Sequence, residues 1–96
     1  MAEGIPNITG SYVGTGVELT IEVGFRPKYI KFANFTTGSA AEYMDSMADD
    51  SVVTHDSGTD AFPTSGGITL TDSGFTIGTN AAVNTSANVV HYLAVA

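Results

Sequence analysis

Apolar and polar side chains alternate most regularly from Val17 to Val23, where every second residue is apolar. This two-residue period is typical of a β-strand with one face turned to water. Gly24 interrupts the pattern. The Arg26-Pro27 pair that follows favours a turn, because proline fixes φ and pushes the preceding residue toward extended geometry. We therefore expect a strand that ends at Gly24.

The next apolar block, residues 29–35, has apolar side chains on both faces of the predicted strand. Ile30 and Phe32 lie on one face, and Tyr29, Ala33 and Phe35 lie on the other. A strand covered on both faces is typical of the centre of a sheet or of an interface.

A hairpin is predicted where residues 68–71 and 75–77 flank the triplet Asp72-Ser73-Gly74. Gly74 is expected to supply the positive φ that a bulged turn needs. The last residues, 89–96, predict a strand that is tied into a sheet, because a frayed end would expose its apolar side chains to water.

Three intervening segments have weaker patterns. Residues 40–47 fit both helical and strand spacing, and we favour a strand. Residues 48–67 are rich in Asp, Ser, Gly and Thr, which predicts mostly loop with at most one short strand. Residues 80–88 predict a polar loop.

The first sixteen residues differ from the rest because glycine and proline interrupt any periodicity, and few large apolar side chains occur there. We expect residues 1–16 to form an extended N-terminal arm. It is either a disordered tail or a segment that orders by adding to the sheet edge of a neighbouring molecule. Residues 17–96 are then expected to form one all-β domain, a small antiparallel β-sandwich or jelly-roll-like body.

Composition narrows the class of protein further. The chain has 96 residues, 43% hydrophobic and 14% charged, and it contains no cysteine. This excludes disorder driven by high charge, a disulfide framework and a cysteine nucleophile. No apolar run approaches the roughly 20 residues of a membrane-spanning helix, so we expect no membrane partner.

The formal net charge of −7 comes from ten acidic residues against Arg26, Lys28 and Lys31. Binding to a polyanion requires several basic side chains on one face, and the field of the carboxylates would oppose it. We therefore expect no nucleic-acid partner.

Two Asp-Ser-Gly triplets, at 56–58 and 72–74, resemble the catalytic triplet of retroviral aspartic proteases, which also have short chains. Their flanking residues depart from that pattern, and Asp and Gly are ordinary turn residues. His55 with nearby aspartates has no spacing diagnostic of a metal site, and His91 in its apolar strand is expected to be a hydrogen-bonded structural residue. We expect a protein that is not an enzyme and has no cofactor or metal.

Three segments of the chain, taken in their order along the sequence, resemble a recurrent domain of tailed-bacteriophage virion proteins. The family shows a Gly-Phe-x-Pro-Lys strand entry, a Gly-Phe-x-Val/Ile-Gly hairpin and a terminal Tyr-x-Ala strand. The matching segments are residues 24–34, 66–78 and 91–96. The family includes small head decoration, or cement, proteins and modules of tail fibres and host-recognition appendages.

The short chain with its predicted arm favours a head decoration protein. The resemblance then implies a homotrimer on the outer surface of the capsid, bound to the major capsid protein and stabilising capsomer contacts against the pressure of packaged DNA. The residues that we expect to dock are Ile5, Ile8, Tyr12, Arg26, Lys28 and Lys31. A tail-fibre or appendage module involved in host-surface recognition remains the alternative.

Overall fold

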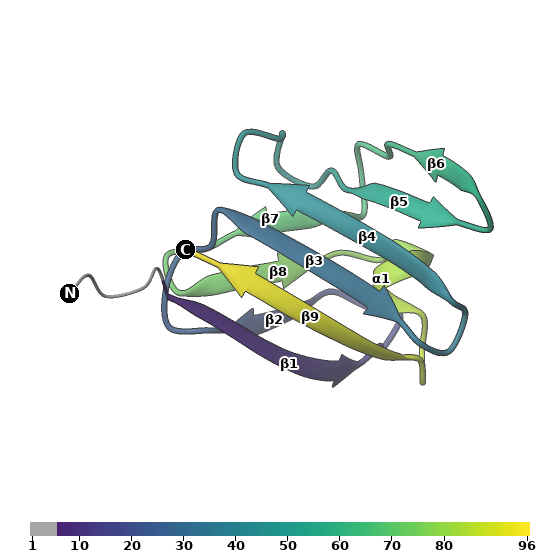
Figure 1. Cartoon of the computed structure of the whole chain (residues 1–96), viewed down its shortest axis with the longest axis horizontal. Coiled ribbons are helices and arrows are strands. Elements are labelled where there is room, and N and C mark those ends of the chain that lie inside the picture. The colour runs from purple at the N-terminus through teal and green to yellow at the C-terminus, as the bar shows by residue number, and fades with distance from the viewer. Residues whose placement is uncertain (1–5) are drawn as a thin grey trace.

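The computed structural model describes residues 6–96 as a β-sandwich of two antiparallel sheets with the hydrophobic core between them (Figure 1). The larger sheet has the strand order β1-β9-β3-β4-β5-β6, and the smaller has the order β2-β8-β7. This confirms the predicted all-β sandwich. The strands are β1 (Asn7–Val13), β2 (Leu19–Glu22), β3 (Tyr29–Asn34), β4 (Ser39–Met44), β5 (Val53–Asp56), β6 (Thr59–Ala61), β7 (Ile68–Leu70), β8 (Gly74–Ile77) and β9 (Val89–Val95).

Several predicted strands are confirmed. The alternating block near the N-terminus forms β2, which ends before Gly24, a residue with φ of 90°. β3 lies between β9 and β4, which confirms its predicted central position, although its outer face is not covered by other described residues. Residues 39–44 form a strand, and the C-terminal strand β9 is held between β1 and β3.

The predicted arm of residues 1–16 is not a separate unit in its described part. Residues 7–13 form β1, which pairs with β9 of the same chain along its whole length. Gly10, one of the glycines that interrupt the sequence pattern, is closely packed, because a Cβ at this position would lie 2.6 Å from Oη of Tyr92. Residues 7–13 therefore belong to the body, and they pair with the chain's own sheet and not with the edge of a neighbouring molecule.

The segment 48–67 contains two strands, β5 and β6, where at most one was expected. They form a hairpin through Ser57 and Gly58, whose φ values are 53° and 80°. Two consecutive residues with positive φ are the signature of a type I′ turn, which matches the twist of the flanking strands. The first Asp-Ser-Gly triplet is thus a hairpin turn.

The second triplet behaves differently. The hairpin of β7 and β8 is confirmed, but Gly74 is not among the residues with positive φ and lies buried in β8 opposite Glu22 of β2. A Cβ at this position would clash with the main-chain oxygen of Ile21. Glycine is needed here because the β2 backbone approaches closely, not because the turn requires it.

The predicted polar loop 80–88 includes one helical turn, α1 (Ala81–Asn84). The Asn80 side chain caps it by accepting a hydrogen bond from the Ala82 main-chain nitrogen at 2.9 Å. Within residues 6–96, no helix is long and apolar enough to cross a bilayer.

The core is built from the inward-facing side chains of both sheets. Ile30 and Phe32 of β3 are almost fully buried, and the Phe32 ring meets Phe75 of β8 edge-on with ring centroids 5.8 Å apart. At the end of the sandwich near α1, the buried Asn84 side chain donates to the carbonyls of Val17 and Gly78, each at 2.7 Å. These bonds fix the loops without leaving the buried amide unpaired.

Candidate docking surface

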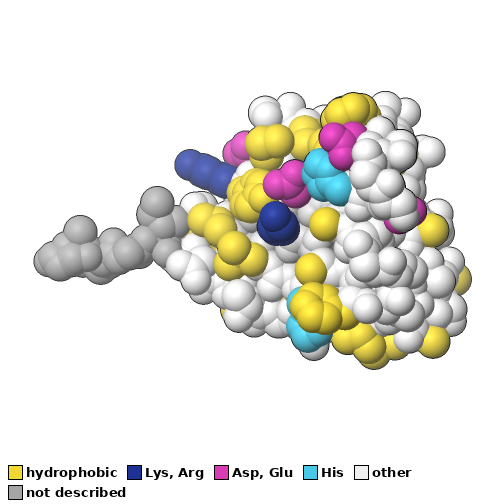
Figure 2. Space-filling model, turned by 45° about the vertical axis from the view of Figure 1, so that its right-hand side comes forward, with side chains coloured by type: hydrophobic (Ala, Val, Ile, Leu, Met, Phe, Trp, Pro, Cys, Tyr) yellow, Lys and Arg dark blue, Asp and Glu magenta, His cyan; other side chains and the backbone are white. Residues whose placement is uncertain are grey.

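The outward face of the six-stranded sheet is not covered by any other described element of the chain. Successive side chains of a strand point to opposite faces, so the residues that alternate with the core positions form this surface, which we call the outer face. Figure 2 shows hydrophobic side chains spread over it, with charged and histidine side chains between them. The outer face comprises Thr9, Ser11 and Val13 of β1, Val89, His91, Leu93 and Val95 of β9, Tyr29, Lys31 and Ala33 of β3, Ala40, Glu42 and Met44 of β4, Val53 and His55 of β5, and Asp60 of β6.

Large apolar side chains are exposed on and beside this face. The exposed fractions are 56% for Val13, 44% for Met44 and 39% for Val89. Phe35, directly after β3, is 75% exposed, and its ring lies 4.8 Å from that of His91. His91 is therefore an exposed residue with an aromatic neighbour, not the hydrogen-bonded structural histidine that we expected.

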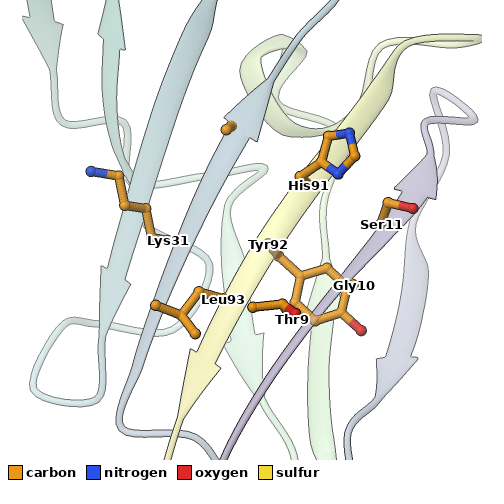
Figure 3. A pocket seen from close by; sticks show the side chains of 8 residues that line it. Thr9, Gly10, Ser11, Lys31, His91, Tyr92 and Leu93 are labelled. Atoms are coloured by element: carbon orange, nitrogen blue, oxygen red, sulfur yellow. The ribbon is translucent and has the colours of Figure 1, made fainter.

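A shallow groove of about 440 Å³ crosses the outer face over β1, β9 and β3 (Figure 3). The side chains of Thr9, Ser11, Lys31 and His91 line it together with that of Leu93. The groove thus combines an apolar surface with hydroxyl, ammonium and imidazole groups. Such a mixture suits a polar ligand or a protein side chain.

Beside the groove, four strands contribute to a hydrogen-bonded chain of polar side chains. The Tyr29 hydroxyl donates to Oε2 of Glu42 at 2.6 Å. Nε2 of His55 lies 2.9 Å from Oε1 of Glu42, and Nδ1 of His55 lies 2.7 Å from Oδ1 of Asp60. We call these four residues the Glu42–His55 network.

The network shifts the pKa values of its members. The hydrogen bond from Tyr29, followed by that from His55, lowers the pKa of Glu42. Hydrogen bonds to Asp60 and Glu42 raise the pKa of His55. Desolvation, helped by the bond to Glu42, raises the pKa of Tyr29 to about 12. Glu42 thus favours its ionised form and His55 its protonated form.

The hydrogen bonds of His55 determine which chemistry its ring can perform. Both ring nitrogens of His55 face carboxylates, which is the arrangement of an imidazolium donor and leaves neither nitrogen for a serine hydroxyl or a metal ion. Within residues 6–96, no three His, Cys, Asp or Glu side chains are grouped so as to hold a metal. The sequence analysis noted only aspartates close to His55 in the chain, of which Asp60 is a partner in the structure, and it did not identify Glu42.

The apolar residues predicted to dock have different positions. Ile5 lies outside the described residues. Ile8 is 38% exposed at the edge of the sheet. Tyr12 is only 8% exposed, and its hydroxyl donates to the Val83 carbonyl at 2.6 Å, so it is a core residue and not a docking residue. Burial also raises the pKa of its phenol.

The three basic residues do not form one patch, although they are close in sequence. Lys31 belongs to the outer face, whereas Arg26 and Lys28 lie exposed in the connection between β2 and β3. The sequence analysis did not identify Phe35 as a surface residue, because it treated both apolar faces of the 29–35 strand as covered, and it did not single out Met44 of β4. The alternation along β3 and β4 shows which residues share a face, but it does not show which of the two faces is covered.

Comparison with known proteins identifies no relative: no protein-family model, no curated protein and no solved structure matches this chain.

Proposed function

We propose that this chain is a non-enzymatic structural protein of a tailed-bacteriophage virion, which binds the outer surface of the assembled head as a decoration, or cement, protein. The observation that supports this best is the outer face, a broad sheet surface with exposed Val13, Met44 and Val89 and with the exposed Phe35 beside it. Exposed apolar side chains that gather on one face are typical of a protein–protein contact. The identity of the partner, the major capsid protein, rests on the resemblance of the three sequence segments.

In this proposal, each copy binds across the boundary between capsomers and only where the assembled lattice places two capsid surfaces side by side. Binding to the assembled state adds its free energy to that state by mass action. Contacts with two capsid subunits at once raise the effective concentration of the second contact. The shell then resists the outward pressure of packaged DNA without any catalytic step. The homotrimer is implied by the resemblance alone, and this proposal does not depend on the number of copies that associate.

The decisive experiment locates the chain on the virion and then weakens the outer face. Cryo-electron microscopy of the virion of origin should reveal density of this size regularly spaced on the capsid exterior. Heads that lack the protein should take up added wild-type chain. The Phe35→Ser variant should bind them at least about tenfold more weakly, the loss expected from removing one large aromatic contact.

Val17→Ser is the matched control, because Val17 is 63% exposed but lies in the connection to the three-stranded sheet. It should bind as the wild type does. Equal binding by both variants would contradict the assignment of the outer face, and absence of the chain from the virion would contradict the capsid proposal itself.

A second candidate function is a tail-fibre or appendage module that recognises a host surface. The groove lined by Thr9, Ser11, Lys31 and His91 favours it, since hydroxyl and cationic groups beside apolar Leu93 suit a carbohydrate or an acidic ligand. In that case the density would appear at the tail and the capsid exterior would be bare.

A further inference from the structure

The two sheets have four edges, and three of them are protected against pairing with another chain. The β7 edge is covered by the chain itself, because Asp50 donates from its nitrogen to the Ile68 carbonyl at 2.8 Å and Ile68 donates to Ser51 at 2.9 Å. The β6 edge is only three residues long, carries Asp60, and is followed by Pro63. Short strands, charges and proline are ordinary means of preventing edge-to-edge association.

The third protected edge is β2, which lies between two carboxylates. Glu18 precedes the strand and Glu22 is its last residue, and both are exposed. A second β2 approaching this edge in antiparallel orientation would bring like charges together, which opposes pairing.

Within residues 6–96, the fourth edge, β1, has none of these protections. It is seven residues long, and Asn7–Val13 contains no charged residue and no proline, although the whole chain carries a net charge of −7. It pairs residue by residue with β9 without a bulge. A long, regular and uncharged edge strand is the kind that accepts another strand.

The main-chain groups of β1 that point away from β9 can be identified from the hydrogen bonds at its two ends. The Gly14 nitrogen donates to Asn88 at 2.8 Å, and the Ala96 nitrogen donates to Pro6 at 2.9 Å. In an antiparallel pair, alternate residues turn both their N–H and C=O toward the partner strand. The N–H and C=O groups of the even-numbered residues of β1 therefore point to β9. The main-chain groups of Thr9, Ser11 and Val13 point to the open edge.

We propose that β1 pairs with β1 of a second copy of this chain, antiparallel and about a two-fold axis at Gly10. In this register Thr9 of one copy lies opposite Ser11 of the other, and each such pair exchanges two main-chain hydrogen bonds. Residues opposite each other share a face of the sheet, so the two six-stranded sheets become one continuous sheet. Their outer faces then form a single surface.

The occupant is a second copy because the strand is complementary to itself in this register. Thr9 and Ser11 place two small hydroxyl side chains opposite each other, and Gly10 lies opposite Gly10 at the axis, so no bulky side chains crowd each other on that face of the sheet. A two-fold contact of this kind uses the same surface on both subunits and closes after two copies. The pairing depends on β1 alone and not on the capsid proposal.

The first test is the mass of the purified chain in solution, measured by light scattering after size exclusion over a wide concentration range. The expected result is a species of twice the 9.9 kDa of one chain that dissociates on dilution. A monomer even at millimolar concentration would overturn the proposal. A trimer, as the sequence resemblance implies, would overturn it as well.

A pair of variants tests the register itself. Thr9→Lys with Ser11→Lys places two lysines opposite each other at both contacts, and like charges directly opposite are destabilising. This variant should be monomeric. Thr9→Lys with Ser11→Glu places a lysine opposite a glutamate in the same register and should remain dimeric.

Far-ultraviolet circular dichroism controls for folding, since both variants change the same two exposed side chains and should keep the wild-type spectrum.

Ser11→Pro provides an independent check. It removes an N–H that points to the open edge and no bond to β9, and proline is tolerated on the solvent side of an edge strand. It should also be monomeric. A folded lysine–lysine variant that dimerises as the wild type does, or a folded Ser11→Pro dimer, would refute β1 pairing.

Discussion

The two faces of the six-stranded sheet are made by the same strands, yet they differ in what they do for the molecule. On the inner face of β3, Ile30 and Phe32 are almost fully buried against the smaller sheet. On the outer face of β3, Tyr29 and Ala33 are half-buried and Lys31 is exposed. The inner face forms the hydrophobic core with the smaller sheet, whereas the outer face is left uncovered by the rest of residues 6–96. Substitutions on the two faces should therefore separate stability from docking.

The largest effect is expected from truncating the centre of the inner face. Phe32→Ala removes a ring that packs edge-on against both Phe75 and Tyr12, and large-to-small changes of this type cost about 3–5 kcal/mol. Leu93→Ala, on the outer face beside Lys31, is the control and should cost less than about 1 kcal/mol. Urea unfolding monitored by circular dichroism measures both. Equal losses would contradict the division between the faces.

A smaller loss is expected at Asn34, the polar residue of the inner face at the end of β3. Its side chain donates to the Ala82 carbonyl at 3.2 Å and accepts from the nitrogens of Thr36 and Thr37. Asn34→Ala leaves these groups without their partner, which should cost about 1–3 kcal/mol in urea unfolding. If stability were unchanged, water would be replacing the amide, and Asn34 would not fix the turn between β3 and β4.

On the outer face, His55 should give a pH-dependent contribution to stability. Its folded pKa is raised above the ordinary value of 6.5, so its contribution is complete below that value and is lost as pH rises through the folded pKa. Glu42, whose pKa is lowered from 4.5, contributes above that value and loses its contribution as pH falls. The network is therefore most stabilising between these two ordinary values.

The corresponding experiment compares Tm of the wild type and of His55→Gln from about pH 5 to about pH 9. The wild type should lose more Tm over this range than the variant does. Parallel curves would show that the two carboxylates do not hold the imidazolium in the folded protein.

The smallest effect on stability is expected from Tyr29→Phe, which removes the hydroxyl that donates to Glu42. Because this bond is the main cause of the lowered pKa of Glu42, that pKa should rise toward 4.5 in an NMR titration of the side-chain carboxyl. Stability should fall by no more than about 1 kcal/mol. Tyr43→Phe removes a hydroxyl from the inner face one residue away and should leave the Glu42 titration unchanged.

The sequence predicted the strands whose side-chain pattern is local. Alternation identified β2, the apolar side chains on both faces of β3 indicated a central strand, and the apolar end of the chain predicted β9. The sequence did not show which of two structural roles the glycine of each triplet has. Gly58 and Gly74 both end an Asp-Ser-Gly triplet, but only Gly58 has a positive φ, whereas Gly74 makes room for a neighbouring backbone. The sequence around Gly74 does not show that the β2 backbone packs against it.

The candidate docking surface was predicted only in part for the same reason. Lys31 lies on the outer face, whereas Tyr12 is in the core, because the register of β1 on β9 turns its side chain inward opposite Val90. The contact of His55 with Glu42 depends on the pairing of β4 with β5, which joins residues distant in the sequence. No spacing in the chain specifies such a pair.

The sequence by itself determined the all-β class and most strands, because a two-residue hydrophobic period and local turn residues act over a few neighbouring positions. The tertiary structure decided which sheet each strand joins, which face is covered and which edge stays open. It therefore also decided that residues 7–13 are an edge strand of the body and not an arm. These properties depend on strand register and on contacts between distant segments, which no local pattern encodes.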